Sequence, residues 1–191
     1  MAIERVFLSP KQPKLFDRAV QDLQNALAAK CLFLDHIFGR CERLVKEVEG
    51  RRVYFPNVYK GGDEYILLTP DNTDLGNYCF FVREDPEEIA ANFGVFNRWK
   101  CPFSLVVWVD MRRVEDADER DVHGFEGKIM DAIGAPSALR HGGMEIQRVY
   151  HRAESVFDGF TLDEVDNQFL MSPYYGLRVS FELWIDDECN Q

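Results

Sequence analysis

The stretch SPYYGLRVSFELWID, residues 172–186, decides the fold class that the sequence predicts. Every second residue from Leu177 to Ile185 is apolar, and Arg178 is one of the polar residues between them. This alternation is typical of a strand that buries one face in an antiparallel or mixed sheet. Trp184 falls on the polar face, which indicates that something covers this face or binds to it.

Two further strands and a helix precede this strand in the second half of the chain. Residues 101–114 and 143–157 carry strand patterns, and between them the apolar residues from Val122 to Ile133 recur at helical spacing. The sequence therefore predicts a strand–helix–strand–strand core.

The N-terminal part has the spacing of a helix. Apolar residues recur every three or four positions within residues 14–49, Pro13 precedes this run and Gly50 follows it. The spacing predicts a helix over 14–49, which a kink at Gly39 would divide in two. Such a helix would be about 54 Å long, longer than a compact domain of this size is wide, so we expect it to bend back or to reach a neighbour.

The next block is rich in strand patterns. Strands are predicted at 51–59, 64–70 and 76–82, separated by loops of Gly, Asn and Asp. Asp85 and Pro86 have the positions of an N-cap and a first helical residue, which predicts a short helix after the last of these strands.

The sequence therefore predicts one α+β domain over residues 1–191. We expect a mixed, largely antiparallel sheet packed by helices on one face, with a long N-terminal helical segment. Its parts are a helical segment at 1–50, a β-rich insertion at 51–95 and the strand–helix–strand–strand core at 96–191.

Charge narrows the classes of function. The chain has 22 Lys and Arg against 33 Asp and Glu, a net charge of −11 at pH 7. Phosphate binding requires clustered cations, so this balance argues against a protein that wraps nucleic acid. It is compatible with a surface that repels nucleic acid, or simply with high solubility.

The sequence gives no sign of a membrane segment, a cofactor or a metal. No apolar run approaches the roughly 18 residues of a membrane span, and the N-terminal residues carry charges where a signal peptide is apolar, which predicts a cytoplasmic protein. The cysteines are Cys31, Cys41, Cys79, Cys101 and Cys189. Without CxxC spacing they predict reduced thiols rather than disulfides or a zinc site, and we expect no cofactor.

Enzyme motifs are missing from the sequence. It contains no GxxxxGKS/T, GxGxxG, GxSxG or HExxH pattern. The best candidates for a catalytic or ligand site are Asp110, at the end of a strand, with His123 and His151. We therefore predict that the chain is not an enzyme, and the alternative is a small enzyme or ligand-binding domain with a site near the sheet edge.

Large aromatic residues fall on faces that the patterns expose. Trp108 lies on the non-core face of its strand, and two tyrosines precede the last strand. Such side chains indicate either a second layer over the sheet or a protein–protein interface. The predicted interface residues are Trp108, Tyr174, Tyr175, Trp184, Arg51 and Arg52. The two arginines are candidates to meet a neighbour's acidic surface.

The helix DVHGFEGKIMDAI and the closing strand YYGLRVSFELWI, with the strands around them, resemble the tail-terminator and tail-completion proteins of tailed bacteriophages. The stretches LFLDHIFGRCERLV and VYFPNVYKGGDEYILL also look like structural proteins encoded among phage and prophage neck and tail genes. Tail-terminator and tail-completion proteins are small α+β subunits that form rings at the joint between head and tail.

The resemblance implies a structural virion protein, assembled in the host cytoplasm. It would form a homo-oligomeric ring at the head–tail junction, bind neighbouring neck or tail proteins, and let DNA pass without sequence-specific binding. The acidic balance suits such a channel. A further alternative, from charge alone, is an acidic decoy that binds a basic host protein.

Overall fold

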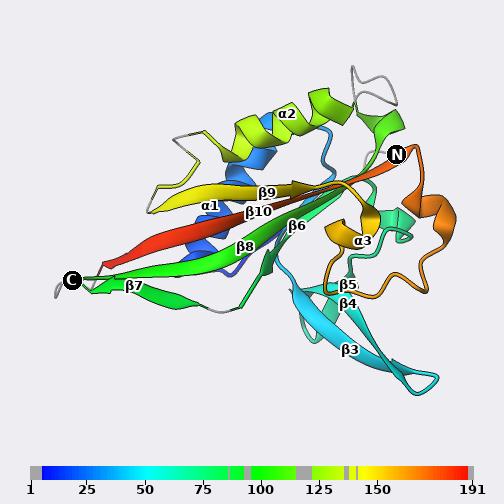
Figure 1. Ribbon diagram of the computed structural model, residues 1–191, viewed down its shortest axis with the longest axis horizontal. Coiled ribbons are helices and arrows are strands. Elements are labelled where there is room, and N and C mark those ends of the chain that lie inside the picture. The colour runs from blue at the N-terminus through cyan, green and yellow to red at the C-terminus, as the bar shows by residue number, and fades with distance from the viewer. Residues whose placement is uncertain are drawn as a thin grey trace.

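The computed structural model describes residues 6–85, 87–92, 96–114, 122–135, 138–140 and 142–188. Two long strands form its centre (Figure 1). They are β8 (Phe96–Asp110) and β10 (Tyr174–Glu188), which pair antiparallel along all 15 residues of each. The predicted closing strand is therefore confirmed, and it lies inside the sheet, between β8 and β9.

The main sheet has seven strands, and the first three are parallel to one another. Its order is β1 (Val6–Leu8), β2 (His36–Arg40), β6 (Tyr78–Arg83), β8, β10 and β9 (Gly143–Tyr150), with β7 (Glu88–Asn92) paired to β8. A second sheet consists of β3 (Glu42–Val48), β4 (Arg51–Gly61) and β5 (Glu64–Leu67). Figure 1 shows this second sheet projecting away from the main one.

Two helices, α1 (Phe16–Lys30) and α2 (Val122–Ile133), cover one face of the main sheet. The odd-numbered residues of β8 and β10, such as Leu105 and Val179, pack with these helices in the larger core. Because successive side chains of a strand point to opposite faces, the even-numbered residues lie on the other face.

A second core forms on that other face. Val106 and Trp108 of β8 pack there with Phe157, Val58 and Leu68. The covering elements are the one-turn helix α3 (Ala153–Val156) and the loops around it, together with residues of β4 and the β5 region. Three short 3₁₀ turns complete the described chain: Thr73–Leu75, Met111–Arg113 and Asn167–Leu170.

The fold class predicted from the sequence is wrong. The chain is mostly β, and the long N-terminal helical segment does not exist. Residues 6–50 contain a single helix, α1, which ends at Lys30 and is followed by β2 and β3. β2 is buried at four of its five residues, so its apolar run lacks alternation and continues the helical spacing by coincidence.

A hairpin turn replaces the predicted end of the helix. Glu49 and Gly50 have φ angles of 51° and 77° and join β3 directly to β4. Two-residue hairpin turns with positive φ at both central residues match the twist of paired strands. Gly50 therefore serves a turn between strands and not the C-terminus of a helix.

Two shorter predictions also differ from the structure. The helix expected from Asp85 is replaced by β7, and Pro86 lies outside the described residues. The strand expected over 143–157 ends at Tyr150 and gives way to α3. The helix α2, in contrast, is confirmed, because its apolar stripe faces a single core.

Trp108 tests whether the second core stabilises the protein. Its side chain is 3% exposed, packs edge-to-face on Phe157 at 5.4 Å, and leaves its indole N–H without a partner among the described residues. Trp108→Ala should lower the free energy of unfolding by about 3–5 kcal/mol. Trp108→Phe should cost less, because it also removes the unpaired N–H. Urea denaturation measures both, and a loss below about 1 kcal/mol for Trp108→Ala contradicts the second core.

Candidate interaction surface

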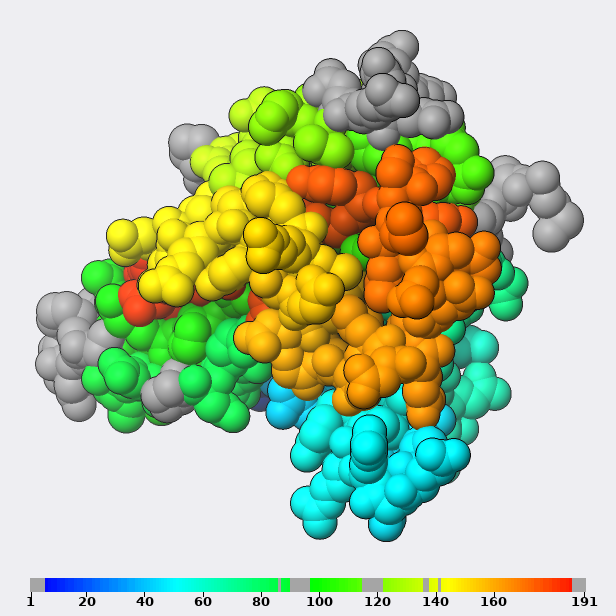
Figure 2. Space-filling model, turned by 45° about the vertical axis from the view of Figure 1, so that its right-hand side comes forward, coloured from blue at the N-terminus to red at the C-terminus, as the bar shows by residue number. Residues whose placement is uncertain are grey.

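The β3–β4 hairpin, residues 42–57, extends from the body and is called the arm below. Figure 2 shows it in cyan at the lower end of the molecule, beneath the orange segment that follows α3. Five of the seven residues of β3 are exposed, among them Val45 at 50%. On β4, in contrast, Val53, Phe55 and Asn57 are buried, at 7%, 6% and 3% exposure, so β3 and the tip make up the exposed part of the arm. A two-stranded ribbon is marginally stable alone, so a partner that covers this exposed part would stabilise it.

Contacts with the body fix the direction of the arm. The backbone N–H of Tyr54 donates to the Thr161 hydroxyl at 3.0 Å, and the Thr161 N–H donates to the Tyr54 carbonyl at 2.8 Å. The guanidinium of Arg43 lies over the rings of Tyr54, at 5.1 Å, and Phe160, at 5.8 Å. The arm is therefore a braced projection and not a free hairpin.

Arg51 and Arg52 lie at the tip of the arm, directly after the turn. Both are exposed, and neither guanidinium has an ion-pair partner in the part of the chain that the structure describes. Exposed cations at the end of a projection are available to pair with acidic groups of another molecule. Their role as interface residues stays a prediction.

The aromatic candidates are divided between core and surface. Trp108 is buried in the second core, so the expectation that it faces a partner is not supported. Tyr174 is half-buried beside the same core, with its ring 5.2 Å from that of Phe169 and 5.7 Å from the Arg112 guanidinium. The second layer that the sequence left open is therefore present and accounts for both residues.

Trp184 remains partly exposed on the face opposite the helices. Its ring lies against Gly143 of β9, where a Cβ atom would overlap the indole. An aromatic ring across a strand glycine covers backbone that the missing side chain leaves bare. Trp184 is thus an available surface aromatic, held flat on the sheet.

The face opposite the helices has two halves. The half around Trp108 is covered by the second core, whereas the half around Trp184 carries ion pairs. Arg98 forms two hydrogen bonds to Asp186, at 2.7 and 2.9 Å, and Lys100 pairs with Glu182 at 2.5 Å. All four side chains remain partly exposed, between 27% and 39%. We call this half, on β8, β10 and β9, the open face. The sequence showed these residues as polar but not as cross-strand pairs, which depend on register.

The residues proposed for an enzyme site are only partly brought together. Asp110 is engaged by Arg112, whose side chain donates to both carboxylate oxygens at 2.9 and 2.7 Å. Burial raises the pKa of Asp110, but the hydrogen bonds from Arg112 outweigh it and hold the pKa below its usual value. Asp110 is thus an ionised turn residue that contacts neither His123 nor His151.

The two histidines meet around Glu126 of α2. The Tyr175 hydroxyl lies 2.5 Å from a Glu126 oxygen and 2.8 Å from His151 Nδ1, and His123 lies 3.8 Å from the other oxygen. Burial, followed by the hydrogen bond to Glu126, raises the pKa of Tyr175 above its usual value. Tyr175 therefore stays a neutral phenol that donates to the Glu126 carboxylate, and this hydrogen bond joins β10 to α2.

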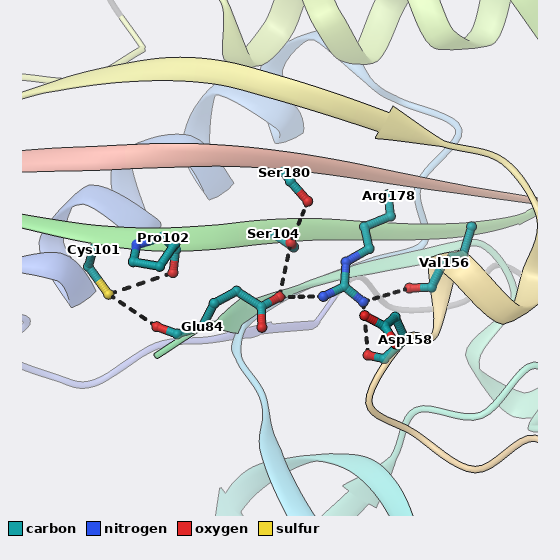
Figure 3. A network of polar contacts seen from close by, with 8 residues as sticks. All are labelled: Glu84, Cys101, Pro102, Ser104, Val156, Asp158, Arg178 and Ser180. Atoms are coloured by element: carbon teal, nitrogen blue, oxygen red, sulfur yellow. Dashed lines mark hydrogen bonds and ion pairs between the residues drawn. The ribbon is translucent and has the colours of Figure 1, made fainter. Parts of the chain in front are cut away.

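A buried cation lies between the second core and the open face. Arg178 of β10 is 4% exposed, and its guanidinium donates to the carbonyls of Val156, at 3.3 Å, and Asp158, at 2.9 Å (Figure 3). It also forms an ion pair with Glu84, which follows β6. One side chain thus ties the end of α3 and the residue that follows β6 to β10.

Two serines complete this network. The Ser104 hydroxyl donates to the Glu84 carboxylate at 3.1 Å and lies 3.0 Å from the Ser180 hydroxyl (Figure 3). These hydrogen bonds join β8 and β10 to the residue that follows β6.

An open groove lies where the arm meets the body, with a volume of about 390 Å³. Its charged residues are Lys11, Asp17, Arg40, Glu42 and Lys60. Arg40 and Asp17 form an ion pair at 3.4 Å, and the lining contains neither His nor Cys. Within the described ranges, no three His, Cys, Asp or Glu side chains are arranged to hold a metal, and no helix is long and apolar enough to span a membrane.

Comparison of the sequence with models of known protein families and with curated proteins gives no match.

The Arg178–Glu84 pair should show a measurable coupling. Arg178→Met, Glu84→Gln and the double variant form a cycle, and we expect a coupling free energy of about 1–3 kcal/mol from urea denaturation. The lower part of this range applies because the Glu84 side chain is 36% exposed. The exposed pair Lys60–Glu64 serves as the matched control and should couple by about 0.5 kcal/mol or less. Equal coupling in both cycles contradicts a structural role for Arg178.

Proposed function

We propose that the chain is a structural subunit of a ring at the head–tail junction of a tailed bacteriophage, through which DNA passes. The proposal starts from the resemblance of the sequence to tail-terminator and tail-completion proteins. The arm is the structural observation that supports it best. The partners of the subunit are further copies of itself and neighbouring neck or tail proteins, and its final place is the virion.

The arm favours assembly because β3 and the tip are exposed and contacts with the body brace the arm in one direction. A rigid projection on one side of a subunit binds a different surface on its neighbour, which is a head-to-tail contact. Head-to-tail contacts close into a ring when the rotation between copies divides a full turn. The unpaired Arg51 and Arg52 at the tip add electrostatic attraction to acidic copies.

The open face suits the wall of a channel for DNA. Its central cations, Arg98 and Lys100, already form ion pairs with Asp186 and Glu182. Binding of phosphates draws on cations that are free to displace counterions, and this face has few to offer. DNA would therefore slide past such a wall with little retention.

Ring formation is tested on the full chain by light scattering and negative-stain electron microscopy across a wide range of concentrations. We expect the mass to rise to one multiple of the chain's mass and the images to show closed rings with a central opening. Subunits that stay monomeric at all concentrations even under chemical cross-linking, or that stop at a twofold dimer, contradict the proposal.

Charge reversal at the arm tip should weaken assembly without unfolding the subunit. The variant Arg51→Glu/Arg52→Glu should raise the concentration needed for half-maximal assembly at least about tenfold, equivalent to about 1.4 kcal/mol. Its thermal midpoint should stay within a few degrees of the parent, because both side chains are exposed. Lys14→Glu/Lys128→Glu, at exposed sites away from the arm, makes the same change of charge and should leave assembly intact.

A further inference from the structure

Four neighbouring strands form a strip at one end of the main sheet, in the order β7, β8, β10 and β9 (Figure 1). Within the described residues β7 pairs only with β8, and β9 only with β10, so each has one edge without a backbone partner. Ile89 on β7 is 57% exposed and Val149 on β9 is 38% exposed. Open edges with exposed apolar side chains are places where a further strand adds to a sheet.

The two open edges match in direction. Each neighbouring pair in the strip is antiparallel, so β9 runs in the same direction as β8 and β7 runs opposite to it. Copies related by a ring axis along the strands keep the same orientation. β9 of one copy therefore meets β7 of the next as an antiparallel pair, and the alternation continues around the ring.

The two edges also match in position along the strands, provided that the strands are tilted relative to the ring axis. Ile89 lies opposite Trp99, whereas Val149 lies opposite Val179, which itself lies opposite Leu105. The edges are thus displaced by 105 − 99 = 6 residues along β8. Six residues span about 20 Å and four strands about 19 Å, so joining the edges tilts the strands by about 45°. Strands of closed barrels have a similar tilt.

We propose that β9 of each copy adds to β7 of the next copy, with Val149 opposite Ile89, so that the ring closes as a continuous antiparallel barrel. This inference rests on the proposed ring and names a second contact between its subunits, in addition to that of the arm. The register joins two exposed apolar side chains on the helix-covered side of the sheet. It also sets Glu88 diagonal to Arg148 on the open face, where long side chains of opposite charge attract. The helices then lie outside and the open face lines the channel.

A disulfide between copies tests this contact. In a Cys189→Ser background, the single variants Ile89→Cys and Val149→Cys are mixed as monomers, concentrated and oxidised. Cα atoms of opposite residues in an antiparallel pair lie about 4.5–5.5 Å apart, within the range that a disulfide spans. Both positions are exposed, so neither substitution disturbs a core.

The native cysteines should not form disulfides that interfere with this test. Cys31, Cys79 and Cys101 are buried, with 0% exposure. Burial raises the pKa of Cys41 to about 12, with a smaller contribution from Glu84, so this thiol forms little of the reactive thiolate.

The mixture should give disulfide dimers that contain one chain of each variant, in at least half of the protein on a non-reducing gel. Each variant oxidised alone should remain a single chain. The double variant Ile89→Cys/Val149→Cys should give a ladder that ends at the number of subunits in the ring. The control Ile89→Cys/Met171→Cys, whose second position is exposed but off the β9 edge, should give no ladder.

The outcomes separate this contact from the ring itself. Rings in electron micrographs without disulfides in the mixture overturn the edge pairing and leave the proposed ring standing. The absence of both rings and disulfides overturns the two together. Dimers from Val149→Cys alone mean that β9 pairs with β9 of another copy, which also overturns the proposal.

Discussion

The pairing of β8 with β10 is the constraint on which the rest of the structure depends. It joins 15 residues of each strand in one unbroken register. Because side chains alternate between faces, this register assigns the odd-numbered residues to the helices and the even-numbered ones to the second layer. A slip by one residue would exchange the two sets and place Arg178 beneath α1 and α2. Both cores therefore depend on the same ladder of backbone hydrogen bonds.

The even-numbered face has two different parts, and Arg178 marks the boundary between them. Toward Asp110 the face is apolar and covered, and toward Phe96 it carries ion pairs in contact with water. Removing a guanidinium from water is costly, and Glu84 with two backbone carbonyls offsets that cost here. The same contacts anchor the covering segment at the boundary, so Arg178 determines how much of this face remains exposed.

The sequence predicts elements best where one face of a strand or helix is buried. The helix α2 follows its pattern because its apolar residues all face the larger core. The strand β10 follows its pattern because its odd-numbered residues lie in the same core and its even-numbered residues lie on the other face. β2 is buried on both faces, so its apolar run has no period of two, and the next residues extend a spacing that also fits a helix. The sequence feature that indicates a hairpin here is Gly50, because glycine readily adopts the positive φ of a two-residue turn.

The surface was harder to predict than the strands. The alternation of apolar and polar residues correctly places Trp108 and Val107 on opposite faces of the sheet. It does not indicate whether a second layer covers the face that carries Trp108. That layer comes from segments distant in sequence whose apolar residues are scattered, such as Phe157 and Leu68. The contacts of Tyr175 with Glu126 and His151 and the cross-strand ion pairs likewise depend on tertiary register, which local patterns do not contain.

The tight turn of the arm restricts how its reach changes during evolution. A two-residue loop leaves no slack, so an insertion of one residue in either strand turns every following side chain to the opposite face. Growth by one residue in each strand preserves the pairing and moves the tip outward by about 3.4 Å. The arm is in this sense a spacer with discrete lengths, and variants of the fold can adjust the distance that it bridges in small steps while both cores stay unchanged.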